Sequence, residues 1–518
     1  MKKSSSRTKN SLLNVATSFG GQFLTIVFKF VTRTIFIRTL GIEYLGINGL
    51  FSDILLMLAL TELGFDTAIN FKLYKPVAEN DEQTIRVYLK FYKMAYRTVG
   101  VVILLFGLML IPALQFLIKD YDNLASLGIN ATFVFLLFLM QSISSYLFFA
   151  YQSVIIKVYQ REYILHLVGY LITILTNVSQ IAVLIIWKNY IAYIIMFVVF
   201  SILQNLVYAL IARKAYPQLF VKEANSLSWQ EIISLIKDCG ALFINKLNRV
   251  VIKSSNNLVL SAFIGLGIVG LYSNYLLFYM TIRRIFSEFY RGIKASMGNY
   301  YATNDLENRY FLFKVTNFFT VILYGTAAVG IAVVADELIS AWIGDSYLIA
   351  RPFALLIGIE IFFLGLDVNL GQIKNITGIF KQMWYSPIIG IVINLVVSII
   401  LVQSIGICGV IIGTIAAQVL TVFMIDPWLI HKYAFKFYKP VSQYYTQSMT
   451  YMIILLAVGL ADWWLCSMLF PGKGWMYVFL HVLICAITVP AVFFVVYWKK
   501  PECQFLIKKI KDIKLIKS

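Results

Sequence analysis

The amino-acid sequence predicts an all-α, polytopic membrane protein of about fourteen transmembrane helices, with both termini in the cytoplasm. Three observations predict this class. The chain is 60% hydrophobic and only 13% charged, so most of its surface must face lipid. Apolar runs of about 20 residues recur along it, and its basic residues are placed very unevenly.

The apolar runs predict the individual helices. They lie at residues 11–40, 44–71, 88–117, 129–156, 163–187, 190–212, 238–264, 267–298, 310–335, 350–376, 382–403, 406–430, 448–470 and 475–498. The first run follows the basic segment MKKSSSRTKN. It spans about 30 residues without a small-residue cleavage site, which indicates a retained helix and not a cleaved signal peptide.

The placement of lysine and arginine predicts the topology. Of the 44 Lys and Arg residues, 34 lie in connecting segments or helix ends on the N-terminal side, four lie on the opposite side, and six lie deeper within predicted helices. Cytoplasmic loops carry such an excess of bases. The formal net charge of +19 is therefore a topology signal, and no nucleic-acid partner is needed to explain it.

An internal repeat predicts two pseudo-symmetric halves. The segments LGIEYLGI (40–47) and IGLGIVGL (264–271) share a spacing of glycine and apolar residues. Two six-helix halves with the same orientation would be related by an axis along the membrane normal, as in many transporters. The expected organisation is a six-helix bundle at 1–212, a cytoplasmic linker at 213–237, a second six-helix bundle at 238–431, a helix pair at 448–498 and a basic cytoplasmic tail at 499–518.

Several basic residues within or beside the membrane need acidic partners or water, since each costs roughly 2.5–3.5 kcal/mol at a helix centre. Lys246, Arg249 and Lys253 lie at i, i+3 and i+7 and form one stripe. We interpret the surplus of bases as lining a water-filled cavity that binds an anionic ligand, with phosphate the best match to this chemistry. The candidate binding residues are Arg33, Lys246, Arg249, Lys253, Arg283 and Arg284.

Acidic residues leave an alternative open. Glu360 and Asp367 share one helix face at i and i+7 and could neutralise the 246–253 stripe. The acids Glu62, Asp66, Glu360 and Asp367 are also the candidates for binding a coupling cation, Na⁺ or H⁺. No other cofactor is expected.

Two further sets of residues have structural interpretations. If the first two helices turn near Gly41, Lys29 lies level with Asp53, which predicts a structural ion pair. Tyr272, Tyr275 and Tyr279 repeat at i, i+3 and i+7. They either stack on sugar rings or serve ordinary helix packing.

The motifs of soluble enzymes are missing from the sequence. There is no phosphate-binding glycine–lysine loop, no nucleophile elbow and no His or carboxylate set with metal-ligand spacing. Five scattered cysteines indicate neither a disulfide framework nor a metal site. We therefore predict no catalytic residue, no metal and no enzymatic activity.

Two blocks carry a resemblance to a known family. RTLGIEYLGINGLFSDILLMLALTELGFDTAINFKLYKPVAENDEQTIRVYLKFYKMAYR, which begins at Arg38, and NLVLSAFIGLGIVGLYSNY, which begins at Asn257, resemble the polysaccharide repeat-unit flippases of the multidrug/oligosaccharidyl-lipid/polysaccharide exporter superfamily. The resemblance covers essentially the whole chain.

The resemblance implies translocation of a polyprenyl-pyrophosphate-linked oligosaccharide between leaflets of a bacterial plasma membrane by alternating access, for capsule, exopolysaccharide or O-antigen synthesis. The partners it implies are this lipid-linked oligosaccharide, membrane lipid, and the polysaccharide polymerase and glycosyltransferases of the same pathway. The headgroup would occupy a cationic cavity lined by the predicted helices at 11–40, 44–71, 238–264 and 267–298. In the related lipid II flippases an arginine in the first helix and basic residues in the seventh are important, and by position Arg33 and either Lys253 or Arg249 are the candidates here.

Three alternatives stay open. A teichoic-acid or lipid II flippase would differ only in headgroup. An ion-coupled multidrug exporter of the same fold would present acids to cationic drugs, against the surplus of bases. A membrane polymerase or ligase commonly carries a large external loop with catalytic Arg and His, but the external loops here are short and lack His.

Overall fold

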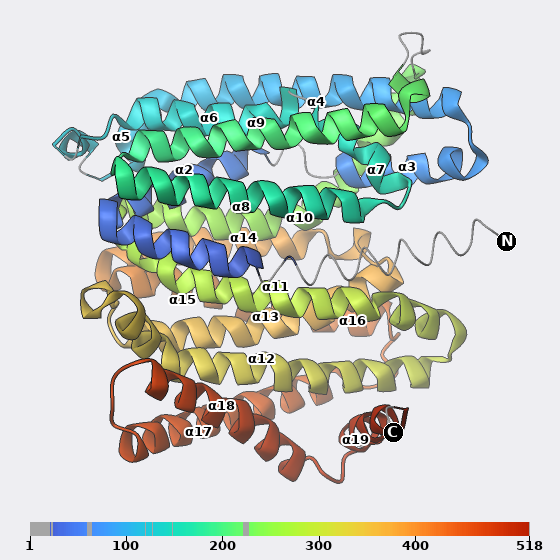
Figure 1. The fold of residues 1–518 in the computed structure, drawn as a ribbon. Coiled ribbons are helices and arrows are strands. Elements are labelled where there is room, and N and C mark those ends of the chain that lie inside the picture. The colour runs from blue at the N-terminus through green and yellow to red at the C-terminus, as the bar shows by residue number, and fades with distance from the viewer. Residues whose placement is uncertain are drawn as a thin grey trace. The chain divides into compact units, whose positions relative to one another are not determined.

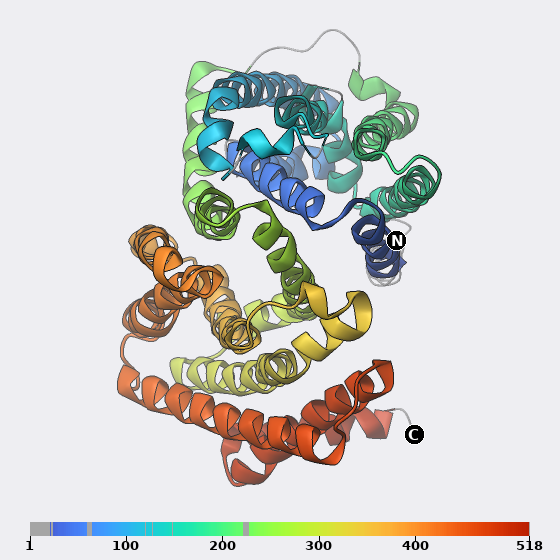
Figure 2. The ribbon, with the colours of Figure 1, turned by 90° about the vertical axis from the view of Figure 1, so that its left-hand side faces the viewer.

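The chain folds into long helices joined by short turns, and the parts that the structure describes contain no strand. The computed structural model describes residues 21, 24–59, 65–119, 121–126, 128–147, 149–220 and 227–516. Figure 1 and Figure 2 show these helices from two directions. The predicted fold class, an all-α polytopic membrane protein, is confirmed.

Two compact units divide the chain: unit 1 is Met1–Gly270 and unit 2 is Leu271–Ser518. Unit 1 holds a helix over residues 24–40 followed by α2 (Ile42–Leu58), α3 (Phe65–Glu79), α4 (Glu82–Leu110), α5 (Leu114–Leu117), α6 (Ala131–Leu147), α7 (Ser153–Val158), α8 (Glu162–Ile186), α9 (Tyr190–Ala215) and α10 (Trp229–Phe263). α11 (Leu266–Thr303) begins in unit 1 and continues into unit 2.

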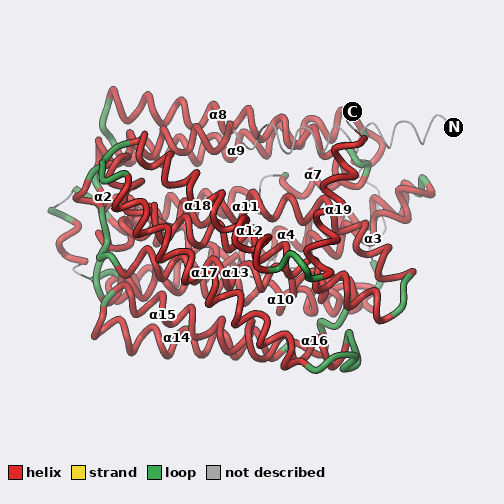
Figure 3. Tube along the Cα trace, turned by 90° about the horizontal axis from the view of Figure 1, so that it is seen from below, coloured by secondary structure: helices red, strands yellow, loops and turns green. Residues whose placement is uncertain are grey.

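Unit 2 continues with α12 (Leu306–Ile343), α13 (Pro352–Thr377), α14 (Tyr385–Ile405), α15 (Ile407–Gln418), a π-helical stretch (Val419–Ile425), α16 (Asp426–Tyr433), α17 (Val441–Leu469), α18 (Trp475–Val496) and α19 (Pro501–Ile516). α14 and α15 lie side by side (Figure 3). A Cβ on Gly409 would lie 2.4 Å from the carbonyl carbon of Leu401, so only glycine allows this approach.

Nine of the described helical stretches are long and apolar enough to cross a membrane, and the bent pair α6–α7 would make a tenth. The remaining predicted spans coincide with the helix at 24–40, α2, α10 and α11. The helix at 24–40, α10 and α11 carry the intramembrane bases of the sequence prediction, and α2 has 17 residues. The total of fourteen spans and the side of the termini stay predictions.

α10 belongs to the first compact unit because it packs against α2, α3 and α5. The unit boundary at Gly270 therefore differs from the sequence-based division at 213–237. The two-bundle description of residues 1–212 and 238–431 stays a prediction about the repeat. It does not describe which helices pack together here.

Polar side chains cap the N-termini of α4 and α10. Asp81 accepts a hydrogen bond from the Thr84 backbone N–H at the start of α4. Ser228 and Glu231 form a reciprocal capping box at the start of α10. Such caps satisfy backbone N–H groups that the first helical turn leaves without partners.

Candidate functional site

The two glycine repeats meet at the start of α2 and α11. A Cβ on Gly46 would lie 2.0 Å from the Leu266 carbonyl oxygen, and one on Gly270 would lie 2.3 Å from the Ile42 carbonyl oxygen. Gly46 and Gly270 are equivalent positions of the two repeats, as are Ile42 and Leu266. Reciprocal contacts of this kind are what a local two-fold axis produces. The internal repeat thus has a structural counterpart.

Further along α2, a buried hydrogen bond joins this helix to α10. The Asn257 Nδ2 donates to Asp53 Oδ2 at 2.5 Å, and Asp53 is only 5% exposed. Sequence analysis assigned Asp53 to Lys29, which is exposed in the structure. The Lys29–Asp53 pair stays a prediction. Asn257 is a neutral partner of Asp53 that the sequence analysis did not anticipate.

The helix at 24–40 packs against α8 and α9 and places Arg33 near Tyr193 of α9. Thr32 donates to Asn177 Oδ1 at 2.8 Å, and the Phe36 ring contacts the Tyr193 ring edge-on. Arg33 is half-buried and lies within electrostatic reach of Tyr193. This aromatic surrounding was not expected from the sequence.

α10 carries a second polar block next to the predicted basic stripe. Ser254, Ser255, Asn256 and Asn257 follow Lys253 directly and are all at most 3% exposed. Within the described part of the chain, the Ser254 hydroxyl and the Asn257 carbonyl oxygen accept or donate no hydrogen bond. α10 is therefore polar at its buried face as well.

Some predicted residues fall outside the description. Glu62 lies outside the described residues. The backbone of α3 and α10 is described, but the structure does not describe the side chains of Asp66, Lys246, Arg249 and Lys253. Their assignments as anion or cation ligands stay predictions.

In unit 2 the predicted acids lie beside a base of α11. Glu360 is buried on α13 and accepts a hydrogen bond from the Tyr279 hydroxyl. Arg283 lies within electrostatic reach of both groups, and Asp367 lies within reach of Tyr279. Arg283 thus has an acidic neighbourhood in its own unit, whereas Arg284 is exposed.

The three α11 tyrosines are packed into unit 2. Tyr272, Tyr275 and Tyr279 are 2%, 1% and 6% exposed. The first two contact the Phe353 ring edge-on, and the Tyr275 hydroxyl donates to Asp336 at 2.6 Å. These contacts are those of the packing interpretation, and the sugar-stacking role stays a prediction.

Sequence reasoning missed a polar network between α12 and the last helix pair. His481 Nδ1 lies 2.5 Å from Glu337. Thr488 donates to the buried Asp462 at 2.6 Å. The partners are more than 25 residues apart in sequence, so periodicity along one helix does not reveal them.

Two buried ion pairs of unit 2 were also missed. Lys374 bonds to Asp426 at 2.5 Å, and Ser386 donates to the same carboxylate at 2.6 Å. Lys314 bonds to Glu502 of α19 at 3.3 Å. The predicted basic tail is therefore a helix fastened to α12 at its first turn. Among the described residues, no group of three His, Cys, Asp or Glu side chains could hold a metal ion.

No known family model and no curated protein matches the sequence. Solved structures match the fold. The lipid II flippase MurJ in an inward closed conformation aligns with a TM-score of 0.59 at 14% identity, over 94% of this chain and 99% of that chain. An inward-facing multidrug resistance MATE family transporter of the MOP superfamily aligns with a TM-score of 0.56 at 14% identity, over 80% and 96%.

A third match is a point mutant of the Vibrio cholerae MATE transporter VcmN, with a TM-score of 0.54 at 14% identity over 84% and 98%. At this identity the likeness concerns the fold. The chain has the fold shared by MATE transporters and MurJ, and it is a multi-pass membrane protein.

Proposed function

We propose that this protein is a flippase that moves a polyprenyl-pyrophosphate-linked oligosaccharide repeat unit from the cytoplasmic to the outer leaflet of a bacterial plasma membrane by alternating access. The observation that carries the proposal is the charge of α10. Three bases at helical spacing precede a buried polar block on a helix of a membrane protein. Pyrophosphate is an anion that such bases bind well.

The proposed ligands of the pyrophosphate are Arg33, Lys246, Arg249 and Lys253. All four belong to unit 1, on the helix at 24–40 and on α10. Arg33 supplies a fork of donors that matches two phosphate oxygens, while lysines supply compact charge. The fold supports this proposal because a lipid II flippase shares it.

Arg283 has a different proposed role. Glu360 and Tyr279 lie within electrostatic reach of it, and Asp367 lies within reach of Tyr279. We propose that Glu360 and Asp367 bind the coupling cation, Na⁺ or H⁺, and that Arg283 moderates their charge. Transport then needs no catalytic residue, and the pathway's polymerase and glycosyltransferases are the proposed partners.

A second candidate function is favoured by the same acids. An ion-coupled multidrug exporter binds cations, and the acidic surplus around Arg283 suits a cationic ligand. The MATE transporters share the fold equally well. A lipid II or teichoic-acid flippase is the variant of the first proposal that differs in headgroup only.

Direct binding tests the proposal. Purified protein in detergent is titrated with polyprenyl pyrophosphate and polyprenyl monophosphate and observed by native mass spectrometry. We expect wild type to prefer pyrophosphate and the variant Arg249→Ala/Lys253→Ala to lose that preference. The loss of two charge-assisted contacts, each worth roughly 1.5–3 kcal/mol, predicts a hundredfold or greater weakening.

The matched control is Lys381→Ala/Lys436→Ala, which removes the same charge from exposed positions of unit 2. It should bind as wild type does. Equal affinity for both lipids in wild type, or unchanged affinity in the α10 variant, would contradict the proposal and favour the cation exporter.

A further inference from the structure

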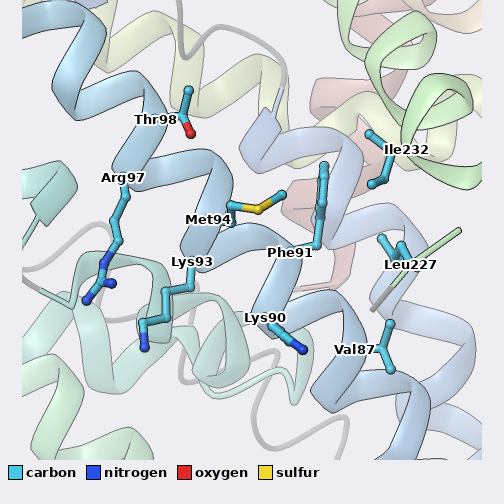
Figure 4. A pocket seen from close by; sticks show the side chains of 9 residues that line it. All are labelled: Val87, Lys90, Phe91, Lys93, Met94, Arg97, Thr98, Leu227 and Ile232. Carbon is cyan, nitrogen blue, oxygen red and sulfur yellow. The ribbon is translucent and has the colours of Figure 1, made fainter. Parts of the chain in front are cut away.

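A basic groove lies in unit 1 between α4 and the start of α10, away from the residues assigned above. It has a volume of about 370 Å³. α4 contributes the cations Lys90, Lys93 and Arg97, while Met94, Leu227 and Ile232 supply apolar surface. Figure 4 shows Lys93 and Arg97 extending to one side of α4, while Leu227 and Ile232 lie on the other side of that helix.

The sequence explains why these cations share one face. Lys90, Lys93 and Arg97 lie at i, i+3 and i+7 of α4, which places them within one stripe. Met94 lies on the same side and is 56% exposed. The groove therefore combines a mostly apolar lining with cations of α4.

The position of the groove along α4 corresponds to the edge of a membrane. Arg97 is the last charged residue before Lys119, and the residues between them are almost entirely apolar. Trp229, the first residue of α10, is 72% exposed, as is typical of tryptophans at a membrane–water interface. Because 34 of the 44 bases lie on the N-terminal side, this edge is predicted to be cytoplasmic.

We propose that this groove binds the headgroup of an anionic phospholipid of the cytoplasmic leaflet. The phosphate lies among Lys90, Lys93 and Arg97, and an acyl chain runs along Met94 toward the apolar part of α4. Basic pockets between membrane helices on the cytoplasmic side bind anionic headgroups in this way. A free phosphate would satisfy the cations but leave the apolar lining in water.

The experiment compares binding of phosphatidylglycerol and phosphatidylcholine to the purified full-length chain by native mass spectrometry. Wild type should bind phosphatidylglycerol more tightly. Each cation near the surface contributes about a fivefold factor in affinity. The triple variant Lys90→Gln/Lys93→Gln/Arg97→Gln should therefore bind phosphatidylglycerol about a hundredfold more weakly, with unchanged binding of phosphatidylcholine.

A control with the same change of charge is Lys381→Gln/Lys436→Gln/Lys439→Gln, at exposed positions of unit 2. It should retain wild-type selectivity. If the triple groove variant does not fold, Met94→Glu places an anion beside the three cations at an exposed position and should weaken phosphatidylglycerol binding alone.

Three results would overturn the proposal. One is wild-type selectivity in both groove variants, and the second is equal binding of the two phospholipids by wild type. The third is displacement of phosphatidylglycerol from the groove by equimolar polyprenyl phosphate, which would make it a substrate site. The first two results do not depend on the flippase proposal, whose test uses α10.

Discussion

The two compact units hold their polar groups in different ways. In unit 2, buried acids and bases join helices that are distant in sequence, as in Lys374–Asp426 and Lys314–Glu502. Among the described side chains of unit 1, the ion pairs Lys75–Glu79 and Arg86–Glu82 lie within single helices and have exposed or partly exposed partners. Hydrogen bonds from neutral donors and close glycine approaches join helices in the interior of unit 1.

This difference separates two uses of charge within a membrane. In unit 2 each ion pair with a buried carboxylate holds two helices together, and its removal should unfold or loosen that unit. In unit 1 the intramembrane bases are concentrated on the helix at 24–40 and α10. Their removal should act on ligand binding more than on stability if the proposed function is right.

The largest loss of stability is expected from Asp426→Ala. Asp426 is 3% exposed and accepts from both Lys374 and Ser386. The substitution leaves the Lys374 ammonium largely buried without its carboxylate, which costs roughly 3–5 kcal/mol in comparable pairs. A thermal unfolding curve of the purified protein measures the effect.

The double variant Lys374→Met/Asp426→Leu distinguishes charge from packing. Replacement of both partners by apolar residues is often close to neutral, so its melting temperature should exceed that of Asp426→Ala. A double variant as unstable as the single one would mean that the pair does not act through its charge.

A somewhat smaller loss is expected from Asn257→Ala in unit 1. Asp53 would lose the donor that reaches it at 2.5 Å, and a hydrogen bond to a charged group contributes roughly 1.5–3 kcal/mol. Lys29→Ala serves as the comparison, since Lys29 is exposed and should cost less. A larger loss for Lys29→Ala would favour the Lys29–Asp53 pair as the principal contact.

The glycine contact between the repeats predicts a loss of about 1–3 kcal/mol for Gly270→Ala, the range for overpacking. The added Cβ would meet the Ile42 carbonyl oxygen at 2.3 Å, and backbone there cannot move aside easily. Gly267→Ala, one turn earlier in α11, is the control. Nothing lies within 4 Å of a Cβ at Gly267, so this variant should melt at or above the wild-type temperature.

The sequence was sufficient for the fold class because apolar run length is a local property, whereas the topology derived from base placement stays a prediction. Each run predicted from hydropathy overlaps a helix, including the bent segment at α6–α7. The repeat was also visible, since Gly46 and Gly270 occupy equivalent positions in matching segments.

The partners of buried polar groups were harder to predict. Asn257 and Asp53 are 204 residues apart, and a neutral amide gives no charge signal that would identify it as the partner. Likewise, Glu360 was considered from the sequence as a partner of the 246–253 stripe, and its position near Arg283 was not anticipated. Sequence periodicity shows which residues share a face, but not which helix that face meets.

The smallest effect is expected at the loop after α12, and it depends on pH. Hydrogen bonds from Ser340 and from Lys473 hold the pKa of Asp345 below its usual value of 3.8. Because the pKa is lowered in the folded protein, the carboxylate stabilises the fold above the pKa of the unfolded chain. That contribution is lost as the pH falls through the folded-state pKa.

Asp345→Asn should therefore lower the melting temperature slightly near neutral pH and have no effect once the pH lies below the folded-state pKa of Asp345, where both proteins carry a neutral side chain. Raised salt should shrink the difference at neutral pH, since Lys473 and Asp345 are 82% and 59% exposed. A difference that persists at low pH would assign the effect to loop geometry. In that case the exposed Lys473–Asp345 ion pair would contribute no measurable stability to unit 2, and the buried ion pairs would contribute instead.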